Sequence, residues 1–178
     1  MKKIVLVVLF FLNISFVMPT DCDNSSELDY FLYPLIRVSY DFNLGFTTSV
    51  GGGVMFTKGE PIGGPYFLYS FPNEFGSPNL RGREYVDGKI LSMGLYSGVG
   101  IASFRVGVNK MIINDTIDRE DGYLRGKTFF DKFIINQPGS YWGLEASSMF
   151  LGITSSGGFL FDGDETPKFN GSIGLGIF

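Results

Sequence analysis

The stretch KILSMGLYSGVGIASFRVGVNKM, residues 89–111, decides the fold because apolar residues alternate along it with glycine, serine and other polar residues. The apolar face of its first half carries Leu91, Met93, Leu95, Val99 and Ile101. After a turn near Ala102 and Ser103 the alternation resumes, with Phe104, Val106 and Val108 opposite Arg105, Gly107 and Asn109. A period of two residues is typical of a β-strand, because successive side chains point to opposite faces. The stretch therefore predicts two strands joined by a tight turn.

Each half of this hairpin has the length, about 9 to 11 residues, that a tilted strand needs to cross a bilayer. The composition agrees with a β-rich protein, since the 178 residues include 25 glycines and are 16% aromatic and only 18% charged. Such values favour an ordered chain over a disordered one. The sequence therefore predicts a membrane β-barrel.

The same alternation recurs along the rest of the chain and predicts about eight strands. Their expected bounds are residues 34–42, 45–56, 65–71, 89–100, 103–112, 140–148, 150–161 and 169–178. The pattern does not break at residues 43–45, so one long strand through the first turn stays open as an alternative. The fold class is all-β, an antiparallel up-and-down β-barrel that follows an N-terminal signal peptide.

The lengths of the predicted connections also alternate. The long ones fall at residues 72–88, 113–139 and 162–168, and the short ones near residues 58–64, 102 and 149. Long loops on the outer side and short turns on the periplasmic side are typical of outer-membrane barrels. This orientation places the C-terminus in the periplasm.

The first 20 residues have the layout of a secretory signal peptide, in which two lysines precede an apolar run too short for a comfortable membrane helix. Residues 21–33 form a lead, which is acidic over its first half, and residues 34–178 form the barrel domain. Processing as a lipoprotein at Cys22 and retention of the apolar run as an anchor helix are the alternatives.

Several chemistries are excluded by composition. The chain contains no histidine and a single cysteine, so no Ser-His or Cys-His dyad and no histidine-ligated metal site can form. The net charge of -4 does not indicate the basic surface that nucleic-acid binding needs. The acidic pattern at residues 115–122 does not fit an EF-hand loop, and the glycine-rich stretches lack the Gly-Lys of a phosphate-binding loop. We therefore expect no catalysis, no cofactor and no metal.

With these features the chain resembles the small, eight-stranded outer-membrane β-barrel proteins of Gram-negative bacteria. The resemblance covers about residues 34–178 and is most specific at the end, NGSIGLGIF, where Phe178 matches the C-terminal aromatic residue that the insertion machinery reads. Ile173, Leu175 and Ile177 alternate on the opposite face from Phe178. The resemblance implies an exported monomer in the outer membrane, with lipid, lipopolysaccharide and the barrel-insertion machinery as partners.

If the apolar faces meet lipid, then Arg37, Asp41, Arg105 and Glu145 point into the barrel. A barrel of eight strands has no open pore, so we expect these charges to form an internal network that makes the barrel rigid. A proton path or a small-ligand pocket is the alternative for the same residues. In a soluble barrel the faces would be inverted and these charges would lie in water.

Aromatic residues near the predicted strand ends suit the girdles that mark the membrane interfaces. They are Tyr30, Phe31, Tyr33, Tyr66, Phe67, Tyr69, Phe71, Phe129, Phe130, Tyr141 and Trp142. The sequence thus predicts an outer-membrane barrel with a structural or surface-interaction role. The alternative is a soluble exported β-barrel, periplasmic or secreted, that binds a small apolar ligand.

Overall fold

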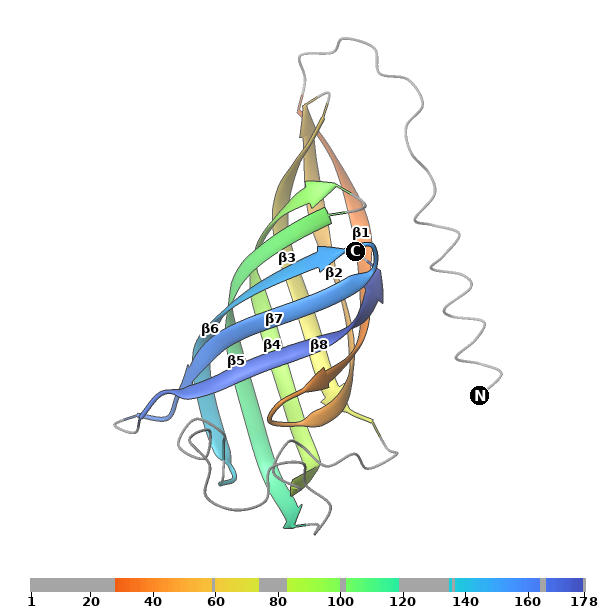
Figure 1. The fold of residues 1–178 in the computed structure, drawn as a ribbon. Helices are drawn as coiled ribbons and strands as arrows, with labels where there is room; N and C mark the ends of the chain where they lie inside the picture. The colour runs from red at the N-terminus through yellow and green to blue at the C-terminus, as the bar shows by residue number, and fades with distance from the viewer. Residues whose placement is uncertain are drawn as a thin grey trace.

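The eight predicted strands are present and close into one barrel. The computed structural model describes residues 28–58, 60–73, 83–99, 102–118, 135, 137–163 and 166–177. Within them each strand pairs antiparallel with its neighbours in the sequence, and β1 closes the sheet by pairing with β8 (Figure 1). The strands are β1 (Asp29–Asp41), β2 (Gly45–Lys58), β3 (Glu60–Pro72), β4 (Arg83–Val99), β5 (Ala102–Asp118), β6 (Gly139–Phe150), β7 (Ile153–Phe161) and β8 (Lys168–Ile177). A search of the described residues for a helix long and apolar enough to cross a membrane finds none.

Most strands are longer than the alternation predicts. β1 begins at Asp29, so residues 29–33 are part of the barrel's first strand and not of the lead. The expected turn at residues 58–64 is wrong, because β2 continues to Lys58 and β3 starts at Glu60. The register shifts between Phe56, which pairs with Gly63, and Thr57, which pairs with Pro61. This bulge lets the two strands stay paired through the segment that contains the glycines and the proline.

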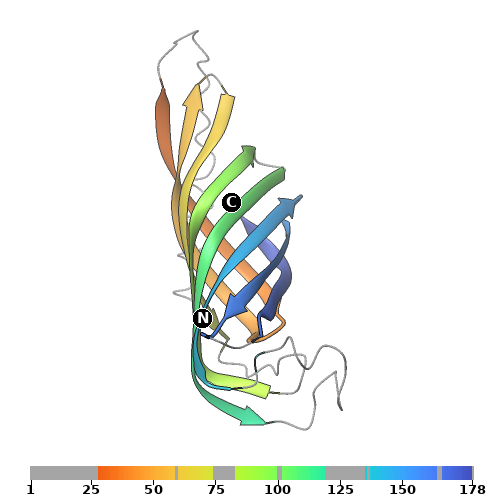
Figure 2. The ribbon, with the colours of Figure 1, turned by 90° about the vertical axis from the view of Figure 1, so that its left-hand side faces the viewer.

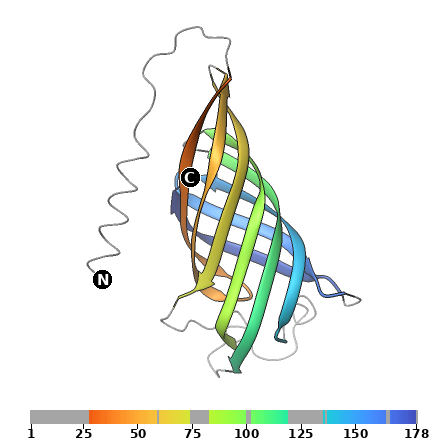
Figure 3. The ribbon, with the colours of Figure 1, turned by 180° about the vertical axis from the view of Figure 1, so that it is seen from behind.

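The turns at the two ends follow the predicted order, with one shift. Residues 42–44 form a true turn, so the single long strand is excluded. The turn expected at residue 149 lies instead at Leu151 and Gly152, whose φ angles of 51° and 80° suit a tight hairpin. The long connections all leave from the end that carries the 42–44 turn, as Figure 3 shows.

The two faces of the strands point as the alternation predicts. Met93, Leu95, Phe104, Val106 and Val108 are exposed on the outside of the barrel, whereas Ser92, Arg105 and Asn109 are buried inside it. Figure 2 shows that the wall is a single strongly twisted sheet, so every strand has one inner and one outer face. The barrel is therefore apolar outside, and its interior contains many polar groups.

The narrow interior depends on glycine where neighbouring backbones approach closely. A Cβ atom on Gly143 would overlap the backbone carbonyl of Phe159 on β7 and lie 2.9 Å from the Cα atom of Leu160. These are main-chain atoms of a paired strand, so they cannot move aside cheaply.

We expect Gly143→Val to lower the free energy of unfolding by about 2–3 kcal/mol, the usual cost of an overpacked position. Urea denaturation followed by tryptophan fluorescence measures the change. Ala146→Val, on the outer face of the same strand, is the matched control and should be close to neutral. Equal effects of the two substitutions would contradict the close approach.

Candidate functional site: the polar interior belt

The interior contains a belt of buried polar side chains, which we call the polar belt. Its members come from all eight strands: Arg37, Ser39, Asp41, Thr47, Ser49, Ser70, Ser92, Ser103, Arg105, Asn109, Glu145, Ser147, Thr154, Asn170 and Ser172. The four residues predicted from the sequence, Arg37, Asp41, Arg105 and Glu145, all lie in it and are at most 7% exposed. The belt is thus the only large set of buried charges among the described residues.

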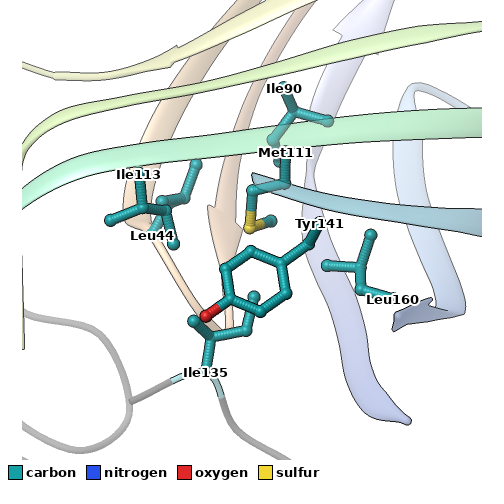
Figure 4. Close-up of a cluster of buried hydrophobic side chains, with 7 residues drawn as sticks. All are labelled: Leu44, Ile90, Met111, Ile113, Ile135, Tyr141 and Leu160. Atoms are coloured by element: carbon teal, nitrogen blue, oxygen red, sulfur yellow. The ribbon is translucent and has the colours of Figure 1, made fainter. Parts of the chain in front are cut away.

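Two apolar clusters flank the polar belt. The loop-end cluster contains Leu44, Ile90, Met111, Ile113, Ile135, Tyr141 and Leu160 (Figure 4). The opposite cluster contains Tyr33, Leu35, Met55, Tyr66, Leu68 and Tyr96. Along β1 the inward positions run from Leu35 through Arg37 to Asp41, and Leu44 follows in the turn, so the charges lie between the clusters. The polar belt is therefore closed off from both ends by apolar side chains.

Arg105 and Glu145 form the centre of the belt. Arg105 pairs with Ser147 and Gly107 pairs with Glu145, so the two charged residues are diagonal neighbours on the inner face of β5 and β6. The guanidinium of Arg105 lies over the ring of Tyr66, 5.3 Å from its centroid. The carboxylate of Glu145 accepts a hydrogen bond from the Asn109 amide. The cation–π contact of Arg105 and the hydrogen bond to Glu145 together fix the positions of these two side chains in the belt.

Asp41 has a local role that the sequence analysis did not assign. Its Oδ1 accepts the backbone N–H groups of Asn43 and Leu44 at 2.9 and 3.0 Å. An aspartate that binds the backbone two and three residues ahead closes a turn in the way an N-cap does. Asp41 therefore fixes the β1–β2 turn in addition to placing a negative charge in the belt.

Arg37 is the second buried cation of the polar belt. Its Nε and Nη1 form no hydrogen bond among the described residues. Its charge acts on Asp41 and on Arg105 through space. The formal charges of the four residues cancel, and burying each charge alone would be costly. The opposite charges of the two arginines and the two carboxylates therefore offset one another inside the barrel.

Hydroxyl pairs join neighbouring strands within the belt. Ser39 and Thr47 lie 3.1 Å apart between β1 and β2, and Ser49 and Ser70 lie 2.8 Å apart between β2 and β3. Ser156 and Ser172 form the same kind of contact, at 2.8 Å, between β7 and β8. Such pairs satisfy buried hydroxyls across the wall, so the serine-rich inner faces reinforce the ladders.

Asn43 is a structural residue that the sequence analysis missed. Its side-chain nitrogen donates to the Phe169 carbonyl at 2.9 Å, and its Oδ1 accepts the Ile135 N–H at 2.9 Å. The turn is thereby connected to β8 and to a residue of the long β5–β6 connection. The Asp-Phe-Asn-Leu-Gly pattern can indicate the turn, but no local pattern indicates partners so distant in the sequence.

The predicted girdle is only partly on the outer surface. Tyr30, Phe31, Phe67 and Trp142 are exposed, and Tyr69 and Phe71 are half-buried. Tyr33, Tyr66 and Tyr141 are instead buried inside the barrel, because they occupy inward positions of their strands. Phe129 and Phe130 lie outside the described residues, as do the predicted signal peptide and Phe178.

Metal-ligating side chains do not cluster in the part of the chain that the structure describes. No group of three or more histidine, cysteine, aspartate and glutamate side chains that could hold a metal occurs there. The buried carboxylates of Asp41 and Glu145 accept hydrogen bonds from neutral donors. In comparisons with known proteins, no family model, no curated protein and no solved structure matches the chain.

We expect Glu145→Leu to destabilise the barrel by about 3–5 kcal/mol, because it leaves the buried arginines without half of their countercharge. The double variant Glu145→Leu/Arg105→Met removes one charge of each sign and should recover much of the loss. Urea midpoints of the three proteins measure this. A double variant as unstable as the single one would contradict the electrostatic coupling.

Asn43→Ala should lower stability by about 1–3 kcal/mol, because it leaves the Ile135 N–H and the Phe169 carbonyl without a partner. It should also increase cleavage of the β5–β6 connection by a protease at limiting concentration. Asn73→Ala, at the end of β3, removes one contact, with Thr48 on the outer surface, and is the control. Unchanged cleavage in Asn43→Ala would contradict the anchoring of that connection.

Proposed function

We propose that this protein is an outer-membrane β-barrel of a Gram-negative bacterium, a monomer with a structural or surface-interaction role and no catalytic activity. The observation that carries the proposal is the inverted distribution of side chains, with charges in the interior and large apolar groups on the outside. The outer surface of the described residues includes Val38, Phe46, Val50, Phe67, Met93, Leu95, Phe104, Val106, Val108, Leu144, Phe159, Ile173 and Leu175.

These side chains lie on all eight strands and so surround the barrel. A soluble monomer rarely exposes a contiguous apolar patch larger than a few hundred Å². In hydrocarbon, exposure of these apolar side chains carries no free-energy penalty. Where every strand of the wall is paired on both sides, no N–H or C=O group of the wall is left without a hydrogen bond. A lipid environment therefore accounts for the surface and the closure together.

The soluble alternative requires the opposite arrangement. It predicts that the glycine and serine faces meet water while the apolar faces converge around a ligand cavity. In the structure the glycine and serine faces surround the polar belt, and the apolar clusters at either end are packed with their own side chains. This distribution favours the membrane barrel over a carrier of apolar ligands.

A contact on the outer wall supports a membrane interface near the loop end. Lys110 lies over the ring of Trp142, with its Nζ 4.6 Å from the centroid, and Trp142 pairs with Phe161 on the next strand. Tryptophan and lysine with apolar neighbours suit the boundary between hydrocarbon and headgroups. On this side the wall would meet lipopolysaccharide, and the charged connection between β5 and β6, residues 119–138, would make the surface contacts.

Fractionation of cells that express the protein tests the proposal. We expect it to sediment with the outer membrane and to migrate faster on a gel without boiling than after boiling, because a closed barrel resists unfolding by detergent. Recovery in the soluble periplasmic fraction, with no shift on boiling, would overturn the proposed location.

Substitution on the outer wall tests the depth of insertion. Leu144→Arg, in the middle of β6, should reduce the free energy of folding into lipid vesicles by about 2–4 kcal/mol, whereas Ile153→Arg, beside the turn, should cost about 0–1 kcal/mol. Equal effects at the two positions would argue against a bilayer around this wall.

A further inference from the structure

The barrel has an uneven rim at the end opposite the long loops. β1 pairs with β2 along its whole length, from Asp29 to Asp41, but with β8 only from Ile36 onwards. The first part of β1 therefore belongs to a three-stranded sheet of β1, β2 and β3 that extends beyond the neighbouring strands (Figure 2). Residues 29–35 have a partner strand on one side only among the residues that the structure describes.

The direction of the backbone groups along this edge follows from the rest of β1. The carbonyls of Ile36 and Val38 face Gly176 and Gly174 of β8, and Phe42 N–H donates to the Gly171 carbonyl at 2.8 Å. Even-numbered residues of β1 thus direct their N–H and C=O groups towards β8. By the alternation of an antiparallel ladder, Tyr30 and Leu32 direct theirs to the open edge, where Pro34 offers only its carbonyl.

The side chains at this edge are apolar and exposed. Tyr30 is 72% exposed and Leu32 is 74% exposed on one face of the sheet, and Phe31 is 42% exposed on the other. Open backbone groups next to apolar side chains make an edge strand ready to pair with another strand. Because unpaired edges do not occur in hydrocarbon, this edge lies in water or is covered.

The opposite edge of the same small sheet is protected. β3 pairs with β4 only from Gly64 onwards, yet the Ile62 carbonyl accepts a hydrogen bond from the Ser97 hydroxyl at 3.0 Å. The open part of β3 is therefore short, and its Ile62 carbonyl already has a partner, whereas β1 has open groups at Tyr30 and Leu32.

We propose that the edge of β1 at residues 29–34 is a docking site for an extended segment of another protein, which adds to the sheet as an antiparallel strand in the periplasm. The segment would carry apolar side chains at alternate positions and a basic residue near its C-terminal end. Asp29, an acidic residue, is exposed at the start of the edge. A basic residue on the partner therefore meets complementary charge.

A second copy of the chain does not fit this edge. Two antiparallel strands that pair edge to edge are related by a two-fold axis normal to their sheet, and the sheet here is the wall of the barrel. That axis would lie in the membrane plane and would point the second barrel in the opposite direction. This step depends on the proposed function, since it assumes that both copies are inserted in one membrane.

The preceding residues of the chain are a poor occupant too. Residues 21–27, DCDNSSE, consist mostly of aspartate, asparagine, serine and glutamate, which are depleted in strands or favour turns. They also offer no apolar side chain to pack beside Tyr30 and Leu32. A separate polypeptide with the stated pattern satisfies the backbone groups and the side chains together.

The test uses the full chain, refolded in detergent micelles, and a fluorescent synthetic peptide of alternating valine and threonine that ends in lysine. We expect saturable binding by fluorescence polarisation and slower hydrogen exchange at the Tyr30 and Leu32 amides. The same peptide with N-methyl groups on alternate amides should not bind. Absence of saturable binding, or equal binding of the methylated peptide, would overturn the proposal.

Two variants separate the backbone contact from the side chain. Leu32→Pro removes one N–H from the open edge and should weaken binding about tenfold, with the gel shift on boiling unchanged. Leu32→Val keeps the N–H and should bind like the unaltered chain. Unchanged affinity of Leu32→Pro would overturn the pairing, because strand addition needs that group.

The remaining outcomes identify other occupants. Slow hydrogen exchange at the Tyr30 and Leu32 amides in the absence of peptide would overturn the proposal. If deletion of residues 21–27 then makes the exchange fast, the lead occupies the edge. If dilution makes it fast, a second copy of the chain occupies the edge. A chain that fractionates with the outer membrane but binds no peptide refutes this inference alone. Recovery of the chain in the soluble fraction would refute the proposed function. In that case peptide binding would still test, independently, whether the edge of β1 accepts an added strand.

Discussion

Closure of the sheet by the pairing of β1 with β8 is the constraint on which the rest of the structure depends. That contact joins residues 36–41 to residues 172–177 and converts a chain of hairpins into a wall. Closure removes the edges of the wall and fixes the curvature, so one face of every strand must fit into a narrow interior. The glycines and serines of the inner faces, and the large apolar residues of the outer faces, follow from this geometry.

The narrow interior in turn explains why charge is placed inside. Eight strands enclose a space that side chains fill, so the polar residues there must satisfy one another. The hydroxyl pairs and the hydrogen bond from Asn109 to Glu145 do this between neighbouring strands. Burial between the two apolar clusters strengthens each electrostatic contact and penalises each missing one. The polar belt therefore favours one packing of the interior over others, which suits a rigid scaffold for external loops.

The sequence was sufficient for the features that depend on the period of two. It predicted eight strands, the inward direction of Arg37, Asp41, Arg105 and Glu145, and the alternation of long and short connections. It could not predict where pairing stops, because a strand's neighbours determine its ends: β1 starts at Asp29 and β3 at Glu60 for that reason. Residues such as Asn43 were missed because their partners lie across the barrel, and Tyr33, Tyr66 and Tyr141 were assigned to a girdle because composition alone does not give the face.

The uneven rim is a consequence of closure and not a defect of it. Staggered strands cannot all end at one level, so a closed barrel must leave parts of some strands beyond the shared wall. The chain treats these parts differently. Beside β3 the Ser97 hydroxyl donates to the open Ile62 carbonyl, whereas beside β1 only Pro34 limits the edge and the apolar residues before it stay exposed. Natural edges that carry no partner are normally blunted along their length. A strand-binding site needs open N–H and C=O groups over a limited length. Tyr30 and Leu32 provide such groups, and Pro34, which lacks an N–H, limits how far the added strand can extend along the wall.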